Sequence, residues 1–416
     1  MVEIANSAAL RRASARDIAD KPVQAATASP ESNAFAPLTT VAASQWCALA
    51  ERAVEPNGYY LPGWELAVNA FATGRTGVSA LRAWSDLPSM QDGTARRLIG
   101  LMPVVSMWRA CRIPLPALVS ASPYGTLCTP LLDCDMTDAA AAALMQQARQ
   151  AGAHALILRD VPLDGAAIRA FGRLLQQQPD DMRPRVLQSY FRACLDATRD
   201  GDELLREALG HKKLKELRRQ RHRLAEHGAI RFEVARTAET VAPAIETFLR
   251  LEASGWKGAR GTALMQDEGD ACFIRRATLA LAELGQCEIA TLRAGNTPVA
   301  AAIVLRHQDR AFYFKIGVNE HFAKLSPGVQ LTLDLTRHLC ADPKIASADS
   351  TASADHPMIN PIWRGRFAIG DVLIPLYSRD PVVSLIHAAM KTRTLVRESA
   401  RRVIHFVRSP TPPPAR

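Results

Sequence analysis

Residues 287–306 read CEIATLRAGNTPVAAAIVLR, and this stretch decides the fold class. Apolar and polar side chains alternate over much of it, and Gly295-Asn296 in the middle is a strong turn signal. We therefore predict two strands, 287–293 and 299–306, that pair as an antiparallel hairpin. A third strand is expected at 310–318, where aromatic side chains favour a pleated sheet.

Helical patterns flank these strands. We predict a strand at 231–235 and helices at 239–254 and 268–284 before the hairpin. After it, a helix at 329–339 and a short strand at 345–349 are expected. This order of strand, helix, helix, three strands, helix and strand predicts a mixed α/β (α+β) fold.

The first half of the chain carries a fainter copy of this pattern. VSALRA at 78–83 resembles IATLRA at 289–294. Each is followed by a turn and a second apolar strand, 98–105 or 299–305. The repeat predicts two tandem copies of one fold, with chance similarity as the alternative because the matching stretch is short.

Composition shifts divide the chain into five parts. We expect an Ala/Ser-rich disordered leader at 1–40, an N-terminal domain at 41–200 and a basic linker helix at 201–228. A C-terminal domain follows at 229–378, and 379–416 forms an amphipathic helix with a Pro-rich tail. The leader lacks the compact apolar segment of a secretory signal.

The overall composition narrows the function classes. The chain has 416 residues and a formal net charge of +10, which favours anionic partners such as nucleic acid, phospholipid headgroups or a phosphorylated cofactor. Its eight cysteines form no CxxC pair and no zinc-like set with histidine, so we expect reduced thiols and no metal. No run of about 20 apolar residues is present. These features predict a cytoplasmic protein.

Several stretches together resemble a known family. They are, in chain order, LMPV at 101–104, TPLL at 129–132, 218–232, FLRLEASGWKG at 248–258, GTAL at 261–264, and FKIG at 314–317 through SPGV at 326–329. On these the chain resembles the CelD-like acetyltransferases of bacterial polysaccharide clusters, which belong to the GNAT superfamily near the FemAB-type transferases. The resemblance implies two tandem GNAT-like acyltransferase domains.

The same resemblance implies acyl-CoA, with acetyl-CoA as the simplest case, as the donor and a saccharide or cell-envelope precursor as the acceptor. One departure matters. Ordinary GNAT enzymes carry a glycine-rich loop before the CoA-binding helix, where this chain has Lys324-Leu325-Ser326-Pro327-Gly328-Val329. FemAB-type relatives use aminoacyl-tRNA with a similarly altered loop, so an aminoacyl-tRNA-dependent transferase stays open as the alternative.

The donor would lie at the start of the helix after Ser326-Pro327-Gly328. A helix N-terminus exposes unpaired N–H groups and the positive end of the helix dipole, which suits a pyrophosphate. Ser326, Gly328 and Val329 would bind it through the backbone, and Lys324 would add charge. The alternative is an ordinary helix cap.

The acceptor would lie near Gly255-Trp256-Lys257-Gly258. Trp256 offers a flat apolar face, and Lys257 offers a positive charge. Lys315, in a strand between aromatic residues, and Glu252, one helix turn before the Trp loop, would complete the substrate-binding set. A buried Trp that anchors a turn is the alternative interpretation.

Acyl transfer needs a base that accepts the proton of the attacking amine or hydroxyl. Asp355 and His356 are ranked first, Asp349 next and Glu252 last. No Ser-His-Asp pattern is visible, so direct attack on the thioester is preferred to a covalent acyl-enzyme. Each aspartate has a structural alternative as a strand end or a turn residue.

Two helices carry unusual charge. The helix at 211–223 has seven Lys and Arg residues without interleaved aromatic residues, which disfavours single-stranded nucleic acid and leaves a solvated helix or a scaffold surface as alternatives. The helix at 381–407 mixes apolar and basic residues. We expect it either to contact the inner face of the membrane peripherally or to pack against the protein body.

Overall fold

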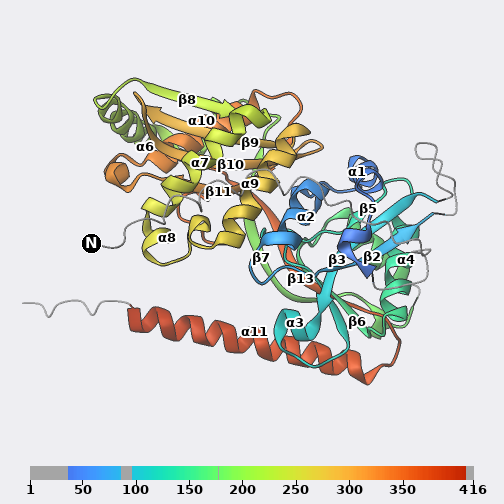
Figure 1. Ribbon diagram of the computed structural model, residues 1–416. Helices are drawn as coiled ribbons and strands as arrows, with labels where there is room; N and C mark the ends of the chain where they lie inside the picture. The colour runs from blue at the N-terminus through green and yellow to red at the C-terminus, as the bar shows by residue number, and fades with distance from the viewer. Residues whose placement is uncertain (1–35, 86–95, 177, 409–416) are drawn as a thin grey trace, which may run out of the picture. The chain divides into compact units, whose positions relative to one another are not determined.

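The computed structural model describes residues 36–85, 96–176 and 178–408, without the side chains of Trp256 and 397–408. A single mixed sheet of 13 strands runs through them (Figure 1). The first part of the chain contains the following helices and strands: β1 (Ala36–Pro37), α1 (Ala43–Glu51), α2 (Pro62–Phe71), β2 (Ser79–Trp84), β3 (Leu98–Ser106), α3 (Met107–Cys111), β4 (Ala117–Ser120), β5 (Leu131–Leu132), α4 (Thr137–Gln150), β6 (Ala155–Pro162), α5 (Ala166–Gln176) and β7 (Arg185–Asp196).

The second part of the chain opens with a long basic helix. Its elements are α6 (Gly201–Ala225), β8 (Ile230–Ala235), α7 (Ala238–Ser254), α8 (Trp256–Ala259), α9 (Glu268–Glu283), β9 (Cys287–Ala294), β10 (Thr297–His307), β11 (Arg310–Val318), α10 (Pro327–Cys340), β12 (Ser347–Asp349), β13 (Gly365–Pro375) and α11 (Pro381–Arg408). Short 3-10 turns lie at Leu38–Thr40, Gly58–Tyr60, Leu264–Gln266 and Glu320–Leu325, among others.

The strand order shows an internal duplication. β2, β3 and β4 form an antiparallel run, β4 pairs with β6 in parallel, and β6 pairs with β13 in antiparallel fashion. β9, β10, β11, β12 and β7 repeat this arrangement in the second half. The two resembling segments, 78–83 and 289–294, correspond to β2 and β9, so they occupy equivalent strands.

The two halves exchange their last strands. β7 follows the first half in sequence but pairs with β12 of the second half, and β13 returns to pair with β6. β7 and β13 also pair with each other from Gly365↔Cys194 to Leu373↔Arg185. Neither strand was predicted from the sequence, and together they join the two halves into one sheet.

Helices cover both faces of the sheet. On one face, α4 and α5 pack on the first half, and α6 and α10 pack on the second half. On the other face, α1, α2, α7 and α9 share one apolar core, and the start of α11 packs over β4 and β6. α4 and α10 occupy equivalent places in the two halves. Each is followed in sequence by the strand, β6 or β12, that pairs in parallel with β4 or β11.

The structure corrects several sequence-based boundaries. Residues 36–40, assigned to the disordered leader, form β1 and a 3-10 turn in which Leu38 is fully buried. Helix α1 follows directly, beginning at Ala43 without a capping side chain. Gly210 (φ 68°) interrupts the long basic helix, which the sequence predicted as continuous. The turn predicted between the strands at 78–83 and 98–105 lies largely outside the described residues, as does the tail at 409–416.

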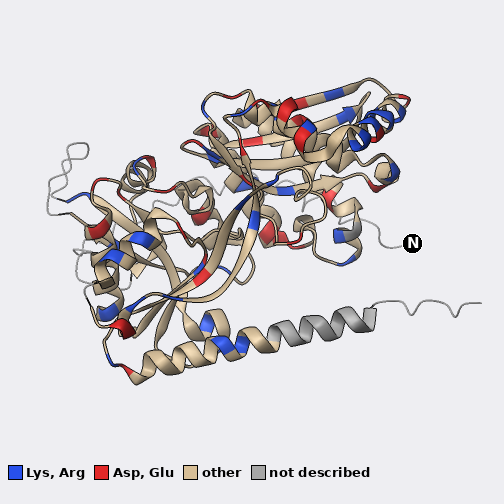
Figure 2. Ribbon diagram, turned by 180° about the vertical axis from the view of Figure 1, so that it is seen from behind, with Lys and Arg blue, Asp and Glu red and all other residues tan. Residues whose placement is uncertain are grey.

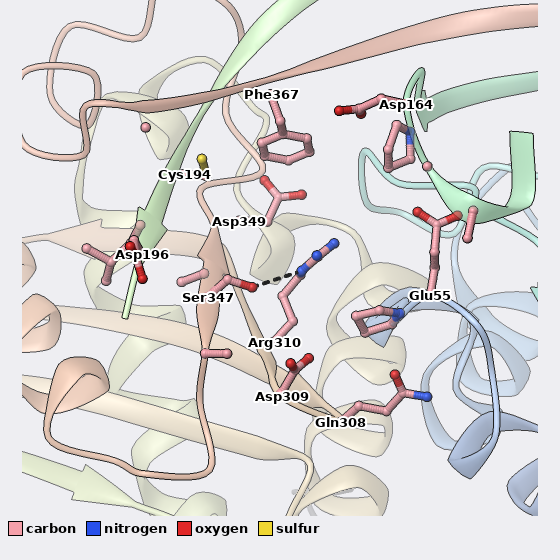
Figure 3. Close-up of a pocket in the computed structure, with 18 of the residues that line it drawn as sticks. Glu55, Asp164, Cys194, Asp196, Gln308, Asp309, Arg310, Ser347, Asp349 and Phe367 are labelled. Atoms are coloured by element: carbon pink, nitrogen blue, oxygen red, sulfur yellow. Dashed lines mark hydrogen bonds between the residues drawn. The ribbon is translucent and has the colours of Figure 1, made fainter. Parts of the chain in front are cut away.

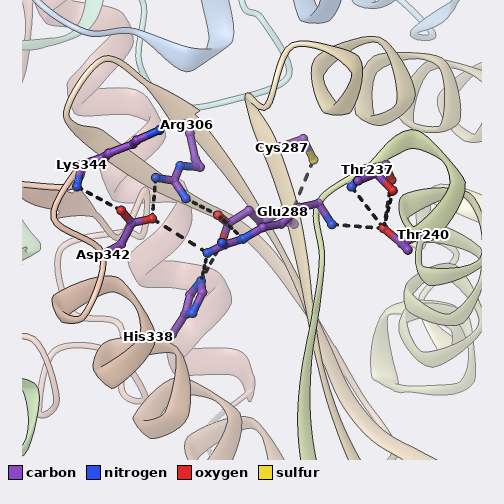
Figure 4. A network of polar contacts seen from close by, with 9 residues as sticks. Thr237, Thr240, Cys287, Glu288, Arg306, His338, Asp342 and Lys344 are labelled. Atoms are coloured by element: carbon purple, nitrogen blue, oxygen red, sulfur yellow. Dashed lines mark hydrogen bonds and ion pairs between the residues drawn. The ribbon is translucent and has the colours of Figure 1, made fainter.

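A buried charge network fixes the far end of α10. Glu288 on β9 accepts hydrogen bonds from Arg306 on β10 and from His338 on α10, the latter at 2.9 Å (Figure 4). Arg306 also donates to Asp342, at 2.7 Å, just beyond the helix. Because Glu288 is buried, these contacts balance its charge and hold the C-terminal end of α10 to the sheet.

Candidate functional site

The parallel strands β11 and β12 pair only briefly. Their register runs from Arg310↔Ser347 to Phe312↔Asp349 and stops there, whereas β10 stays paired with β11 as far as Val318. Beyond Phe312, the described residues add no strand to this edge of β11. The hydroxyl of Thr351 donates to the Tyr313 carbonyl oxygen at 2.7 Å, which marks the point where the two strands separate.

The start of α10 lies beside this open edge. Ser326 adopts a left-handed conformation (φ 52°, ψ 51°) as the N-cap and its side chain makes no capping hydrogen bond. Pro327 occupies the first helical position, and the first turn has no acidic residue. The N–H groups of Gly328 and Val329 therefore lie at a helix N-terminus with neither a capping side chain nor a carboxylate. Lys324 is exposed just before the helix.

Gly328 is packed closely. A Cβ atom at this position would lie 3.1 Å from Val318 Cγ1 and 3.4 Å from both Ile316 Cδ1 and Met358 Sδ. Glycine therefore lets the helix begin directly against β11. A bulky substitution here would disturb packing as well as any ligand.

Two lysines and a buried carboxylate form the polar centre of this region. Glu252 Oε1 lies 3.0 Å from Lys257 Nζ and 3.3 Å from Lys315 Nζ, and Glu252 Oε2 accepts from the Leu264 N–H at 3.0 Å. Burial alone would raise the pKa of Glu252, but the two ammonium groups and this N–H hold it below its usual value. Burial lowers the pKa of Lys315, against the opposing effect of Glu252.

The first half of the chain reaches into the same region. The Tyr124 hydroxyl donates to Asp270 on α9, and the Arg75 guanidinium stacks 4.2 Å from the centre of the Tyr124 ring. Lys315 Nζ lies 5.5 Å from that ring. No local sequence pattern singled out Tyr124, because its contacts join distant parts of the chain.

The predicted catalytic pair divides into two different environments. His356 is half-buried, and its Nδ1 accepts from the N–H groups of Met358 and Ile359 at 3.3 and 3.4 Å. Burial, with a further contribution from Lys257, lowers the pKa of His356. Since Nδ1 accepts, the neutral ring carries its proton on Nε2 and presents a donor. Asp355 is exposed on the same turn.

Asp349 lies apart from the lysine cluster. Its carboxylate forms a buried ion pair with Arg192 on β7 at 3.1 Å, and it accepts from the Thr351 N–H at 2.7 Å. Both side chains are almost completely buried, with 2% and 0% exposed. Arg192 was not singled out from the sequence, although the alternation in β7 could have indicated the strand that carries it.

The structure thus brings Glu252, Lys257 and Lys315 into direct contact, near the start of α10 and the His356 turn. The backbone of Trp256 begins α8, but its side chain lies outside the described residues. The predicted roles of all these residues stay predictions.

A cavity of about 700 Å³ opens between the two halves (Figure 3). Its floor is formed by β11, β12, β7 and β13, and its other walls come from 54–56 and 162–169 of the first half. Asp349 contributes to the lining, and Arg310 reaches into the space between Asp349 and Glu55. Arg310 Nε donates to the Ser347 hydroxyl at 3.1 Å.

One group of possible metal ligands occurs among the described residues, namely Asp133, Cys134 and Asp135. Asp133 already lies 3.0 Å from Arg52 and 3.5 Å from Arg97. Two guanidinium groups therefore occupy the positions from which a cation would be bound, and this group carries no metal proposal.

Comparison with known proteins identifies the domain that holds the lysine cluster. Residues 211–356 match the family model described as an acetyltransferase (GNAT) domain. This part of the chain is a GNAT acyltransferase domain. The match spans α6 to the His356 turn, and it confirms the prediction of a GNAT-family acyltransferase.

Several solved structures align with most of the chain. The alignment with FemX covers 83% of this chain and 98% of FemX, at 12% identity and a TM-score of 0.53. A conserved protein of unknown function from Bacteroides thetaiotaomicron aligns over 80% of this chain and 98% of its own (12% identity, TM-score 0.49). A tandem GNAT protein from the clavulanic acid biosynthesis pathway aligns over 83% and 99% (14% identity, TM-score 0.36). The likeness to FemX confirms the predicted mixed α/β fold of two GNAT-like halves.

Two further searches found nothing. No protein with a curated description matches the sequence. Within the described residues, no helix has both the length and the apolar character needed to cross a membrane.

Proposed function

We propose that the chain is an acyl-CoA-dependent N- or O-acyltransferase that acts on a saccharide or cell-envelope precursor. The observation that carries the proposal is the open edge of β11, with the uncapped start of α10 beside it. Together they offer backbone groups to the amides of an extended acyl-CoA arm and a positive helix end to its phosphates. Acyl-CoA would supply an activated acyl thioester.

The residues present fit this donor. Val329 and Gly328 would offer backbone N–H groups to the pyrophosphate, and Lys324 would add a positive charge at the exposed side of the helix start. Glu252, by contrast, is held ionised by Lys257 and Lys315, so we assign it to positioning those lysines. The lysines would bind an electron-rich group of the substrate.

The reaction requires a proton to leave the acceptor. Its amine or hydroxyl attacks the thioester carbonyl carbon, the C–S bond breaks, and the thiolate leaves with a proton. The His356 Nε2–H is suited to donate to the developing negative charge on oxygen or sulfur. Asp355, exposed on the same turn, is the candidate that accepts the acceptor's proton, directly or through water.

The choice of acceptor rests on the resemblance to CelD-like acetyltransferases of polysaccharide clusters. The GNAT match to 211–356 supports acyl transfer but names no acceptor. A saccharide amine or hydroxyl is the acceptor class that we propose.

A charge placed at the start of α10 tests the donor site. Val329 occupies the third helical position, where Asp stabilises a helix but would repel phosphate. Val329→Asp should weaken CoA binding by about tenfold or more in calorimetry. The reason is that the new carboxylate would repel the CoA phosphates, which the positive end of the helix otherwise attracts. Val329→Asn, which loses the same apolar contacts without the charge, should retain most of the affinity.

The equivalent position of the first half provides the matched control. Ala139 is the third residue of α4 and is exposed, so Ala139→Asp should leave CoA affinity unchanged. Equal affinity in Val329→Asp and Val329→Asn would place the donor elsewhere.

A second candidate, an aminoacyl-tRNA-dependent transferase, is favoured by the surface of α6. Lys212, Lys215, Arg219 and Arg223 follow one another at spacings of three or four residues, all are exposed, and none has a carboxylate partner within the described chain (Figure 2). α6 packs against the turn Glu320–Leu325, just before α10. Filter binding of charged tRNA, with CoA calorimetry in parallel, separates the two donors.

A further inference from the structure

The cavity lies on a surface of the second half whose equivalent in the first half is covered by a helix. The parallel pairs Ala117↔Ala155 and Val119↔Ile157 in the first half correspond to Arg310↔Ser347 and Phe312↔Asp349 in the second. In the first half, α11 covers these positions through Val383, Ile386 and Met390. In the second half, Arg310, Ser347 and Asp349 at the corresponding positions line the cavity.

The side chains at the two surfaces differ in kind. Where the first half has Ala117, Ala155 and Ile157, the second has Arg310, Ser347 and Asp349. The fourth position, Val119 in the first half, corresponds to Phe312, which is fully buried, packs against Tyr59 and does not line the cavity. An apolar surface at these positions would need a helix to cover it, as α11 does in the first half. A polar surface retains its interactions with water or with a polar ligand. The cavity is therefore suited to a small polar ligand and not to a missing helix.

The charges of the lining exclude strong anions. Five carboxylates face the cavity, from Glu55, Asp164, Asp196, Asp309 and Asp349, against two guanidinium groups, from Arg169 and Arg310. Asp349 is balanced by Arg192, but Asp164 and Asp309 are exposed and have no side-chain partner among the described residues. The resulting negative field repels phosphates such as those of CoA, and it favours a neutral or cationic ligand.

The lining also provides groups that recognise hydroxyls. Carboxylates accept from two adjacent hydroxyls, and the free guanidinium nitrogens of Arg310 donate to ring or hydroxyl oxygens. Phe367, on β13, supplies an aromatic face to the cavity lining. A cavity of about 700 Å³ is within the usual range for small-molecule sites and admits more than one sugar ring.

We propose that this cavity binds an amine-bearing saccharide, which is the acceptor of the acyl group. The inference rests on the proposed acyltransferase function for its meaning as an acceptor site, but the binding itself does not depend on it. The ammonium group would interact with the unpaired carboxylates, and the hydroxyls with Arg310 and Ser347.

Hydrogen bonds link the lining of the cavity to the point where β11 and β12 separate. Asp349 lines the cavity and accepts from the Thr351 N–H at 2.7 Å, and the Thr351 hydroxyl bonds to the Tyr313 carbonyl at the start of the open edge. Asp349 and Thr351, at the end of β12, therefore link the proposed acceptor cavity to the proposed donor edge of β11.

Saturation-transfer NMR on the full chain, without CoA, tests the binding. The probes are a β-1,4-linked glucosamine dimer, the glucose dimer of the same linkage, and glucuronate. We expect the amine-bearing dimer to bind at least fivefold more tightly than the glucose dimer, and glucuronate to give no signal. The double variant Asp164→Asn/Asp309→Asn should lose this preference at least fivefold.

The control is the double variant Glu226→Gln/Glu283→Gln, which removes two exposed carboxylates outside the cavity and should bind as the unaltered chain does. Equal binding of the two dimers, preference for glucuronate, no binding, or an unchanged preference in Asp164→Asn/Asp309→Asn would overturn the inference. CoA calorimetry on the same samples keeps the two proposals distinct: absence of CoA binding in every protein refutes the donor but leaves the sugar result readable.

Discussion

The two halves of the molecule share a strand order and a parallel ladder of three residue pairs, and they differ in the contacts made beyond that ladder. In the first half, the chain after β4 stays attached to β6: Arg159 N–H donates to Ser120 Oγ at 2.9 Å, and Cys128 N–H donates to the Asp160 carbonyl at 3.3 Å. In the second half, β12 ends after three residues, and the chain beyond it contacts β11 through the Thr351 hydroxyl, which donates to the Tyr313 carbonyl oxygen at 2.7 Å.

The first turns of the equivalent helices α4 and α10 also differ between the two halves. The first turn of α4 already contains Asp138, which pairs with Arg173, whereas the first turn of α10 contains no acidic residue. A carboxylate at a helix N-terminus occupies the place that a phosphate would take. The two halves therefore share one strand order and differ at the helix start, where the first has a carboxylate and the second has none. This difference is the reason that we propose the donor site in the second half.

The largest expected effect concerns the last parallel pair of each half. Asp349→Asn leaves Arg192 buried without its counter-charge, which should lower the free energy of unfolding by about 3–5 kcal/mol. Ile157→Val, at the equivalent position of the first half, should cost only about 0.5–1.5 kcal/mol. Urea unfolding measures both. If Asp349→Asn instead keeps full stability and loses turnover, Asp349 is the base and the structural assignment is wrong.

A kinetic effect of intermediate size is expected at the His356 turn. His356→Ala should lower kcat by roughly 10²-fold while sparing CoA affinity, because its contribution belongs to the transition state. Asp355→Asn should lower kcat by a similar factor if it accepts the proton. Folded variants with unaltered kcat would remove this turn from the mechanism.

The lowered pKa of His356 also predicts how kcat depends on pH. A lowered pKa keeps His356 neutral to lower pH than an ordinary histidine, so the neutral ring should support activity until the pH falls below about 6.5. A loss of activity that already begins well above pH 7 would contradict the assignment to His356.

The smallest expected effect concerns α11, which covers the first half and has no equivalent on the second. Val383, Ile386 and Met390 are buried, whereas Leu395 and Val396 are more than 60% exposed. We predict that this exposed part contacts anionic lipid surfaces. Deletion of 391–416 should reduce cosedimentation with anionic liposomes severalfold at low salt, since each basic residue contributes roughly 1 kcal/mol. A full-length chain that never cosediments would refute it.

Local patterns predicted much of the second half. The hairpin at 287–306 and the helix after Ser326 depend on neighbouring residues, so alternation and turn signals located them. Glu252 and Lys257 were predicted as substrate-binding residues from the Gly-Trp-Lys-Gly loop and the helix before it, and Lys315 from its place between aromatic residues of a strand. The exchange of β7 and β13 could not be predicted, because strand partners are chosen by contacts between residues more than 150 positions apart.

The same limit explains the residues that were missed. Arg192 and Tyr124 act on partners in the other half, and no local pattern indicates such a contact. The ion pair of Asp349 with Arg192 shows the consequence: a carboxylate that sequence alone ranks as a base is found in a buried charge pair. Burial and pairing depend on the tertiary structure and are not visible in the local sequence, and the catalytic role of Asp349 stays a prediction.

Hydrogen exchange with and without acetyl-CoA tests the central claim most directly, because it reads both halves in one experiment. The account predicts that amides of 313–318 and 328–332 become protected when acetyl-CoA is added, since the donor pairs with the open edge of β11 and the start of α10. Amides of 117–133 and 138–142, the corresponding region of the first half, should not change. Protection confined to the first half, or unchanged exchange in both halves at saturating acetyl-CoA, would contradict it.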